Sequence, residues 1–369
     1  MAGSTTLKLR RFWLQVHKWI GLLLAVLIIP VSVTGSALVW HDGLDLMLNP
    51  ERSVAAPASL PPAAYVEAAR RELAPGERIH SLTLPEGEGA VLVSAARPLR
   101  EGERRPVRTN LWLDPRSGAL IDKSASDEGA VRVLHVLHGS LMVPGLGRQI
   151  VGWIGVFMLI SCLTGIWLWW PVTGSVRRGF RWRRQPSFNA NLHHQLGFWV
   201  MVPLAMLSFT GVWISFPQAF GRFEASAPTA PAAPPRPAQP VEQPRLSLDE
   251  ALAAARSAAP DASPRTISWP TDQRPEWTIA FARGSGPSEV KVAEADGTAT
   301  PAPPPPPETI ARLMRRLHDG TGMGLGWQIV IFLGGLIPAA LAVTGILMWW
   351  RSREWRRRQA RRPQPAPAQ

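Results

Sequence analysis

Histidine is the residue type whose placement in this sequence most clearly suggests chemistry. His17 and His193 each lie 18 positions before the glycine of a Thr-Gly pair, at Gly35 and Gly211. An imidazole nitrogen is a common ligand of transition metals and of haem iron. The equal spacing predicts that His17 and His193 lie at the same depth of the fold, where two imidazoles can bind one metal centre from opposite faces.

A second pair of histidines repeats this pattern. His138 and His318 each lie 27 positions before the glycine of a further Thr-Gly pair, at Gly165 and Gly345. For any single histidine, the alternative explanation is an interfacial residue that is solvated or hydrogen-bonded to a carbonyl. Because the same histidine recurs at the same position of a repeat, we expect this second pair to be ligands at a second depth.

Three other histidines are second-rank candidates. His41 closes an apolar segment, His135 lies one helical turn before His138, and His194 is adjacent to His193. If His41 is a ligand, one member of the second pair is displaced. A zinc site made from His41, His135 and His138 is a further alternative, but no carboxylate or thiolate completes its ligand set.

These histidines lie at or near the ends of four apolar segments. Each segment has about 20 residues without Asp, Glu, Lys or Arg, which is enough to cross a hydrocarbon core of roughly 30 Å as a helix. Tryptophan residues cluster at the segment ends, as is typical of membrane interfaces. The four segments are residues 19–40, 150–170, 196–216 and 327–350.

The charge distribution predicts how these segments are oriented. The chain has 40 basic and 27 acidic residues, a formal net charge of +13. Residues 1–18, 172–192 and 351–369 together carry sixteen basic residues and one acidic residue, whereas 42–149 and 217–326 are each nearly neutral. The positive-inside rule therefore places both termini in the cytoplasm and the two long parts in the periplasm. Little basic surface is left for nucleic acid.

The predicted organisation alternates membrane helices with larger parts outside the membrane. The expected parts are a cytoplasmic amino terminus with the first membrane helix (1–41), a first periplasmic module (42–149), the second helix (150–171), a basic cytoplasmic loop (172–192), the third helix (193–217), proline-rich linkers with a second periplasmic module (218–326), the fourth helix (327–350) and a basic cytoplasmic tail (351–369). The only cysteine, Cys162, lies in the second helix, so disulfides do not hold the modules.

The two halves of the chain also resemble each other. "HKWIGLLLAVLIIPVSVTG" aligns with "HHQLGFWVMVPLAMLSFTG", and each long part has an amphipathic helix pattern followed by strand patterns. "DPRSG" and "EADG" have the composition of tight turns between strands. We therefore predict an α-helical polytopic membrane protein. Its four transmembrane helices form two parallel repeats, each bracketing a small α+β module.

The motifs "HKWIG", "LHHQLGFW", "LDPRSG" and "RLHDGTGMGLGWQI", with two modules bracketed by membrane segments, resemble the PepSY-associated transmembrane family over nearly the whole chain. The resemblance implies periplasmic PepSY-like modules. It also implies kinship with iron-regulated inner-membrane proteins and ferric-siderophore reductases that carry b-type haem. We therefore expect two haem b groups with the two histidine pairs as axial ligands. Gly21 and Gly197, one turn from the first pair, leave space for a flat macrocycle or for close helix packing.

The expected function is electron transfer across the bacterial inner membrane to a ferric siderophore or another periplasmic acceptor. The sequence has no P-loop, no flavin or nicotinamide fingerprint and no nucleophile arrangement. The electron donor must then be a separate cytoplasmic reductase or membrane quinol. An alternative is a haem-free PepSY membrane protein that regulates peptidases or senses the envelope. A third is a subunit of a larger uptake or respiratory assembly.

The orientation can be tested with reporter fusions. Because positive charge is retained in the cytoplasm, fusions after Arg184 and Arg362 should give a cytoplasmic signal. Fusions near Asp122 and Asp296 should give a periplasmic signal, measured with a phosphatase and a fluorescent reporter. A cytoplasmic signal from either module would overturn the orientation.

Overall fold

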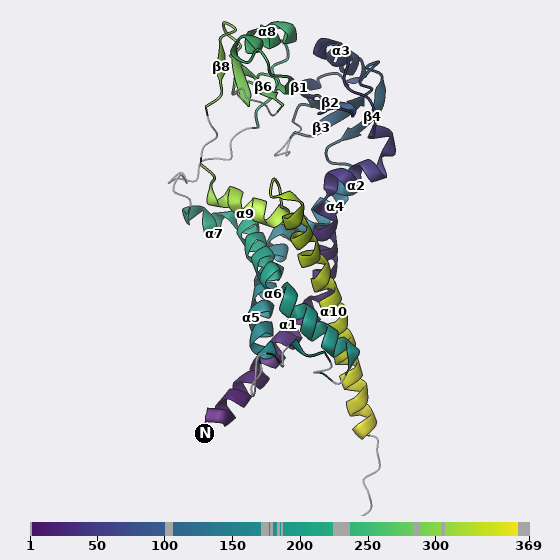
Figure 1. Cartoon of the computed structure of the whole chain (residues 1–369), viewed down its shortest axis with the longest axis vertical. Helices are drawn as coiled ribbons and strands as arrows, with labels where there is room; N and C mark the ends of the chain where they lie inside the picture. Colours follow the sequence, from purple (N-terminus) through teal and green to yellow (C-terminus); the bar gives the residue numbers. More distant parts are fainter. Residues whose placement is uncertain are drawn as a thin grey trace, which may run out of the picture. The chain divides into compact units, whose positions relative to one another are not determined.

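The computed structural model describes residues 2–99, 106–170, 177, 180–182, 185, 187–223, 237–282, 288–303 and 307–360 (Figure 1). The chain divides into a helical unit and a sheet unit. The helical unit spans Met1–His41, Leu134–Ala227 and Glu308–Gln369, and the sheet unit spans Asp42–Val133 and Pro228–Pro307. About half of the predicted loop 172–192, parts of both proline-rich linkers and the tail from 361 onward lie outside the described residues.

Four helices of the helical unit are long and apolar enough to cross a membrane, which confirms the four predicted spans. They are α1 (Ala2–Leu38), α5 (Gly147–Trp169), α6 (Phe188–Ser215) and α10 (Gly324–Ala360). They pack in the cyclic order α1, α5, α6, α10, each against the helix before it and the helix after it. Exposed apolar side chains such as Leu23, Val26 and Trp199 suit contact with lipid.

All four helices begin before the predicted apolar segments, and α1 and α10 extend furthest beyond them. α1 begins at Ala2 rather than near the first apolar segment, and α10 continues to Ala360 through most of the basic tail. The added residues 351–360 of α10 are mostly Arg, Glu, Gln and Ala, which have high helix propensity. Charge therefore marks where a helix leaves the apolar layer and does not mark where it ends.

Short helices precede α5 and α10 in the chain. α4 (Ala130–Ser140) carries His135 and His138, and α9 (Ile310–Asp319) carries His318. α9 packs against α6 and ends at Gly320, whose φ of 79° is readily adopted by glycine. Other short helices among the described residues are α2 (His41–Leu48), α7 (Pro217–Phe220) and the 3₁₀ turns η1 (Pro50–Arg52) and η3 (Gly221–Phe223).

The sheet unit is one antiparallel sheet with strand order β4-β3-β2-β1-β5-β6-β7-β8. Its strands are β1 (Arg78–Thr83), β2 (Val91–Ala96), β3 (Arg108–Leu113), β4 (Leu120–Ala125), β5 (Pro264–Ser268), β6 (Glu276–Phe281), β7 (Glu289–Ala293) and β8 (Ala299–Pro301). The sequence predicted a separate sheet in each module. In the structure β1 pairs with β5, so the two sets of strands join and neither leaves this edge unpaired.

One helix from each module covers this sheet. α3 (Pro62–Glu72) packs on β1, β2 and β3, and α8 (Leu248–Ala258) packs on β6, β7 and β8. Tyr65 and Trp277 are the largest fully buried side chains of the shared core. The predicted turn "DPRSG" is present, because Asp114 accepts hydrogen bonds from the backbone of Ser117 and Arg116. These hydrogen bonds lower the pKa of Asp114.

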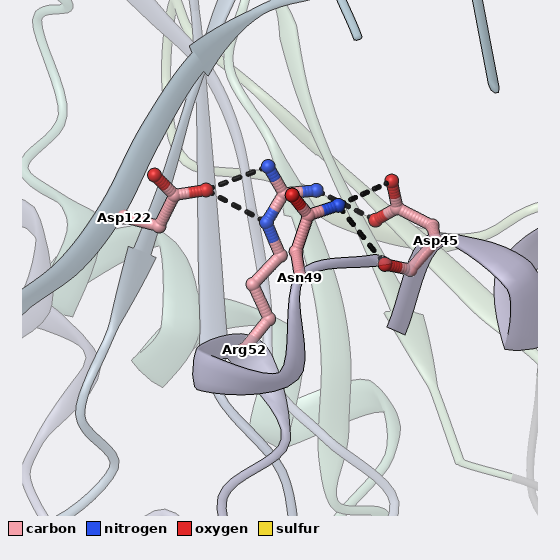
Figure 2. A network of polar contacts seen from close by, with 4 residues as sticks. All are labelled: Asp45, Asn49, Arg52 and Asp122. Atoms are coloured by element: carbon pink, nitrogen blue, oxygen red, sulfur yellow. Dashed lines mark hydrogen bonds and ion pairs between the residues drawn. The ribbon is translucent and has the colours of Figure 1, made fainter. Parts of the chain in front are cut away.

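A buried arginine fastens the start of the sheet unit to the edge of the sheet. Arg52 is 8% exposed and donates to Asp122 in β4 and to Asp45 in α2, both at 2.6 Å (Figure 2). Asn49 donates to the same Asp45, and the Arg52 guanidinium lies 3.8 Å from the ring centroid of Trp112 in β3. This network ties the chain after α1 to two strands.

Replacement of Arg52 tests this network. Arg52→Ala should lower the free energy of unfolding by on the order of 2 kcal/mol, because two carboxylates lose a charged donor and Trp112 loses its packing partner. Thermal or urea unfolding of the full chain in detergent, followed by near-UV circular dichroism, measures the change. Arg70→Ala is the matched control, since Arg70 forms a more exposed ion pair with Glu67 and should have little effect. Equal effects of the two variants would contradict the assignment.

Candidate functional site

Each membrane helix contains one buried threonine followed by a glycine. The pairs are Thr34-Gly35 in α1, Thr164-Gly165 in α5, Thr210-Gly211 in α6 and Thr344-Gly345 in α10. Each threonine hydroxyl donates to the carbonyl four residues earlier in its own helix, at 2.6–2.9 Å. A hydroxyl has one proton, so the threonine oxygen remains available as an acceptor toward other groups.

Three histidines form hydrogen bonds to three of these threonine oxygens. The imidazole Nδ1 lies 3.0 Å from the threonine Oγ1 in the pairs His17 with Thr164, His193 with Thr344 and His318 with Thr210. Because the hydroxyl proton is committed to the helix backbone, the imidazole must be the donor. Each of these histidines therefore carries a proton on Nδ1.

His138 makes the corresponding contact with a backbone carbonyl. Its Nδ1 lies 2.8 Å from the oxygen of Val31, three residues before Thr34. A carbonyl oxygen only accepts, so His138 also carries a proton on Nδ1. In all four histidines the lone pair is then on Nε2, and within the described residues none of these Nε2 atoms makes a hydrogen bond. This arrangement leaves Nε2 free to bind a metal.

The glycine of each Thr-Gly pair allows the imidazole to approach the helix. A Cβ at Gly35 would lie 2.7 Å from Cε1 of His138, and a Cβ at Gly211 would lie 3.2 Å from Cε1 of His318. The corresponding distances for the other two histidines are 3.4 and 3.8 Å. A larger residue at Gly35 would therefore displace the ring that the helix holds.

The four histidines form two facing pairs. The ring centroids of His17 and His193 lie 6.4 Å apart with an interplanar angle of 89°, and those of His138 and His318 lie 6.0 Å apart at 41°. Two metal–nitrogen bonds of about 2 Å each, with the ring radius added on both sides, give a centroid separation of roughly 6 Å. Both pairs are therefore spaced to bind one metal centre from opposite sides.

The two pairs lie near opposite ends of the bundle. Along α1, 18 residues separate His17 from Gly35, against which His138 packs. At the rise of an α-helix this is about 27 Å, close to the thickness of a hydrocarbon core. The same spacing along α6 separates His193 from the glycine that contacts His318.

A cavity of about 780 Å³ lies beside the first pair, and both His17 and His193 line it. Gly21 and Gly197 also line this cavity, and a Cβ built at either one meets no atom within 4 Å in the described part of the chain. Close helix packing therefore does not explain these two glycines. They widen the space next to the rings, in a cavity within the usual size range of cofactor sites.

Basic side chains line the same cavity. Arg10 donates to carbonyls at the carboxyl end of α5, those of Trp167 and Trp170. The other basic residues that line it are Arg11, Lys18 and Arg356. A ligand that combines an apolar body with carboxylates would find both kinds of partner here.

The second pair is half-buried at the end of the bundle from which α4 and α9 extend. Burial lowers the pKa of His318 to about 4, and the neighbouring His138 adds to the effect. Burial likewise lowers the pKa of His138. Both imidazoles are therefore neutral near pH 7, which is the state that binds a metal.

The second-rank histidines occupy other positions. His41 and His135 face each other with ring centroids 5.7 Å apart, and His194 stacks on Trp169 at 5.9 Å. His41 displaces neither member of the second pair. Within the described residues, no group of three or more His, Cys, Asp and Glu is placed to hold a metal ion, so the alternative zinc site with His138 is not formed.

These features fit a haem with two axial imidazoles. Such a group needs two opposed nitrogens with available lone pairs, a flat space between helices, and partners for two carboxylates. The first pair and its cavity supply all three requirements. The second pair supplies the opposed rings at a similar separation.

The fold and the histidine pairs define a polytopic membrane protein with two facing imidazole pairs and an antiparallel sheet unit. Residues 14–352 match the family model described as the PepSY-associated TM region. The chain belongs to this family, as its motifs predicted. None of the curated proteins compared with the chain matches it.

The threonines are the part of the site that sequence reasoning missed. The Thr-Gly pairs served only as markers for aligning the two halves. In the structure the histidines pack on the Thr-Gly pairs. Three of the four histidines donate a hydrogen bond to a threonine of a different helix. The signal was present as four occurrences of Thr-Gly at matched positions, but the pairing of helices was needed to interpret it.

Threonine replacements test this assignment. With haem bound, Thr344→Val should raise the reduction potential of the haem at the first pair, because His193 loses the acceptor that increases its basicity. Thr210→Val should act in the same way on the second pair and leave the first unchanged. A redox titration followed by visible absorbance measures both, and each variant serves as the control for the other. Identical titrations of both variants and the unmodified protein would contradict the proposed contacts.

Proposed function

We propose that this protein carries electrons across the bacterial inner membrane through two haem b groups. His17 and His193 hold one group, and His138 and His318 hold the other. The proposal is carried by the two facing imidazole pairs, each ring having its Nδ1 engaged by a neighbouring backbone or threonine oxygen. When bound, haem iron supplies one-electron exchange between Fe(III) and Fe(II).

The residues of the chain would keep such iron in an electron-transfer role. His17 with His193, and His138 with His318, would each hold one haem through two imidazole nitrogens and so would leave no position on its iron for oxygen or substrate. The threonine and backbone acceptors hold the rings in one orientation, which limits movement when the charge on iron changes.

The charge distribution supports a direction for this transfer. By the positive-inside rule, the first pair would lie on the cytoplasmic side and the second pair on the periplasmic side. About 27 Å of helix separates the two levels, so one carrier near each face divides the distance across the membrane. Electrons would enter from a cytoplasmic reductase or a membrane quinol.

The arrangement of contacts also supports two parallel repeats. α1 places His17 on α5, and α6 places His193 on α10 in the same way. The strand order β4-β3-β2-β1-β5-β6-β7-β8 is likewise symmetric about the β1–β5 pairing. In such an arrangement a two-fold axis along the membrane normal would relate the two halves of the helical unit and pass between the members of each histidine pair.

The basic residues at the first cavity suit the carboxylates of a haem. Arg11, Lys18 and Arg356 line the space that contains His17 and His193. Placed toward the cytoplasmic side, they would pair with the carboxylates and leave the apolar ring edge among the helices.

The leading acceptor is a ferric siderophore, on the basis of the resemblance to ferric-siderophore reductases. Siderophores hold Fe(III) through hard oxygen ligands, and reduction to Fe(II) weakens that hold. One transferred electron is then enough to release the metal. The step needs no acid or base from the protein, which agrees with a sequence that has no catalytic arrangement.

Histidine replacements with haem analysis test the function. His318→Ala should leave the haem at the first pair in place and reducible from the cytoplasmic side, but should abolish reduction of a ferric siderophore on the periplasmic side. Reduced-minus-oxidised spectra of membrane vesicles give the remaining haem, and an Fe(II) indicator gives the product. Full ferric reduction by a protein lacking both His138 and His318 would refute the relay.

The first pair has its own test and a matched control. His17→Ala and His193→Ala should each remove the same haem signal, whereas His194→Ala should retain it, since His194 stacks on Trp169. Electron paramagnetic resonance separates the two sites. The interplanar angles of 89° and 41° predict two different low-spin signals, because perpendicular rings bring two iron d orbitals closer in energy. Absence of haem from the purified protein would overturn the proposal.

A further inference from the structure

The last part of α10, residues 351–360, forms a strongly basic surface of the helical unit. It follows the apolar span directly, and α10 continues through it as one helix (Figure 1). Residues 351–359 are all exposed. We call this segment the basic extension. Its charged residues are five arginines and one acid, namely Arg351, Arg353, Arg356, Arg357, Arg358 and Glu354.

The chain offers almost no acidic residue to balance this charge. The positive-inside rule places residues 1–18, 172–192 and 351–369 on one side, and Glu354 is their only acid. Glu354 accepts a hydrogen bond from Trp350 Nε1. Within the described residues, no arginine of the basic extension makes an ion pair. A binding partner that complements this surface must therefore supply the acidic groups itself.

We propose that the basic extension docks an acidic cytoplasmic electron-transfer protein, which delivers one electron to the haem of the first pair. In this step the reduced carrier loses one electron and the iron changes from Fe(III) to Fe(II). The inference rests on the proposed function for the haem and for the cytoplasmic side. It names the kind of donor, which the proposed function leaves open between a soluble reductase and a membrane quinol.

The basic extension begins at the cavity of the first pair. Trp349, Ser352 and Arg356 of α10 line that cavity, as do His17 and His193. A protein bound to the basic extension would therefore lie next to the first pair. Positive charge at such an entry attracts an acidic carrier over about one Debye length, roughly 8–10 Å at physiological ionic strength, and raises the rate of encounter.

Anionic lipid headgroups are the main alternative partner for a basic segment beside a membrane helix. Arg356 and Arg358 lie six and eight residues beyond Trp350, which ends the apolar span. At the rise of an α-helix these distances are about 9 and 12 Å, whereas the headgroup layer is only about 5–8 Å thick on each side. These arginines would thus extend past the headgroups into the aqueous phase.

The distribution of residues around α10 also favours a soluble partner. A helix that lies on a membrane surface has an apolar face and a basic face. Because successive helical residues turn by about 100°, Arg351, Arg356 and Arg357 point to three different sides. Trp355 is the only large apolar residue of the basic extension, and it is 62% exposed. Tryptophan and arginine are residue types that often dominate binding between proteins.

Reduction by a soluble ferredoxin tests the docking surface. The probe is a reduced plant-type ferredoxin, a small acidic one-electron carrier. It is mixed by stopped flow with the haem-loaded full-length protein in a neutral detergent, and the haem absorbance gives the second-order rate constant. This constant should fall about tenfold between roughly 20 mM and 500 mM salt, because salt screens the charges. At low salt, the double variant Arg357→Glu/Arg358→Glu should lower it about tenfold or more.

The matched control makes the same change of charge in the sheet unit. Arg71→Glu/Arg256→Glu alters two exposed arginines there and should leave the rate constant unchanged. This comparison separates a local surface from the net charge of the protein. Dithionite should reduce the haem completely in every variant, which shows that the histidine pairs and their haem are retained.

The outcomes separate this inference from the proposed function. Equal rate constants for Arg357→Glu/Arg358→Glu and the unmodified protein, or a rate constant independent of salt, would overturn the docking surface and leave the haem relay untouched. An unchanged rate constant with loss of thermal stabilisation by phosphatidylglycerol would also overturn it, because the arginines would then bind lipid. A purified protein without haem would overturn the relay. Salt-dependent binding of oxidised ferredoxin, lost in the double variant, would then still retain the docking surface.

Discussion

The hydrogen bond from imidazole Nδ1 to an oxygen of a neighbouring membrane helix is the contact on which the bundle and its site both depend. A buried imidazole without partners would lose the hydrogen bonds it makes in water, which destabilises a fold by about 1–3 kcal/mol per group. His17 gains its partner only if α5 lies beside α1, and His193 only if α10 lies beside α6. The packing order of the four helices therefore supplies each imidazole with its acceptor. The same contact determines which ring nitrogen can bind a metal.

The imidazole contact requires an acceptor oxygen and space for the ring. The two adjacent residues of the Thr-Gly pair meet these requirements. Threonine supplies an oxygen whose own proton is satisfied within its helix, so it can accept without leaving a donor unpaired. Glycine removes the Cβ that would collide with the ring, as the 2.7 Å approach of His138 to Gly35 shows. The second pair differs in one respect, because His138 donates to the Val31 carbonyl while His318 donates to Thr210. The two rings of that pair thus have unlike acceptors and a tilted geometry.

In the sheet unit, a single pairing of strands satisfies both modules. Chain segments separated by the middle part of the helical unit, Leu134–Ala227, contribute four strands each, and the β1–β5 pairing removes an exposed edge from both. Arg52 then connects the start of the first segment to β3 and β4 through Asp122 and Trp112. A single shared sheet buries more apolar area than two small ones, since each module alone would have a limited core.

Residue order alone predicted the membrane spans, the family and the correspondence between histidines. Hydropathy, charge asymmetry and equal spacings depend only on residue order, so the four spans and the pairs His17–His193 and His138–His318 were predictable. The helix ends were not, because α10 continues through residues whose helix propensity outweighs their charge. Only the tertiary structure decided that the rings of one helix rest on the threonines of another, that β1 pairs with β5, and that His41 faces His135. These are contacts between residues distant in the chain, and the order of residues along a helix does not specify which neighbour its surface will meet.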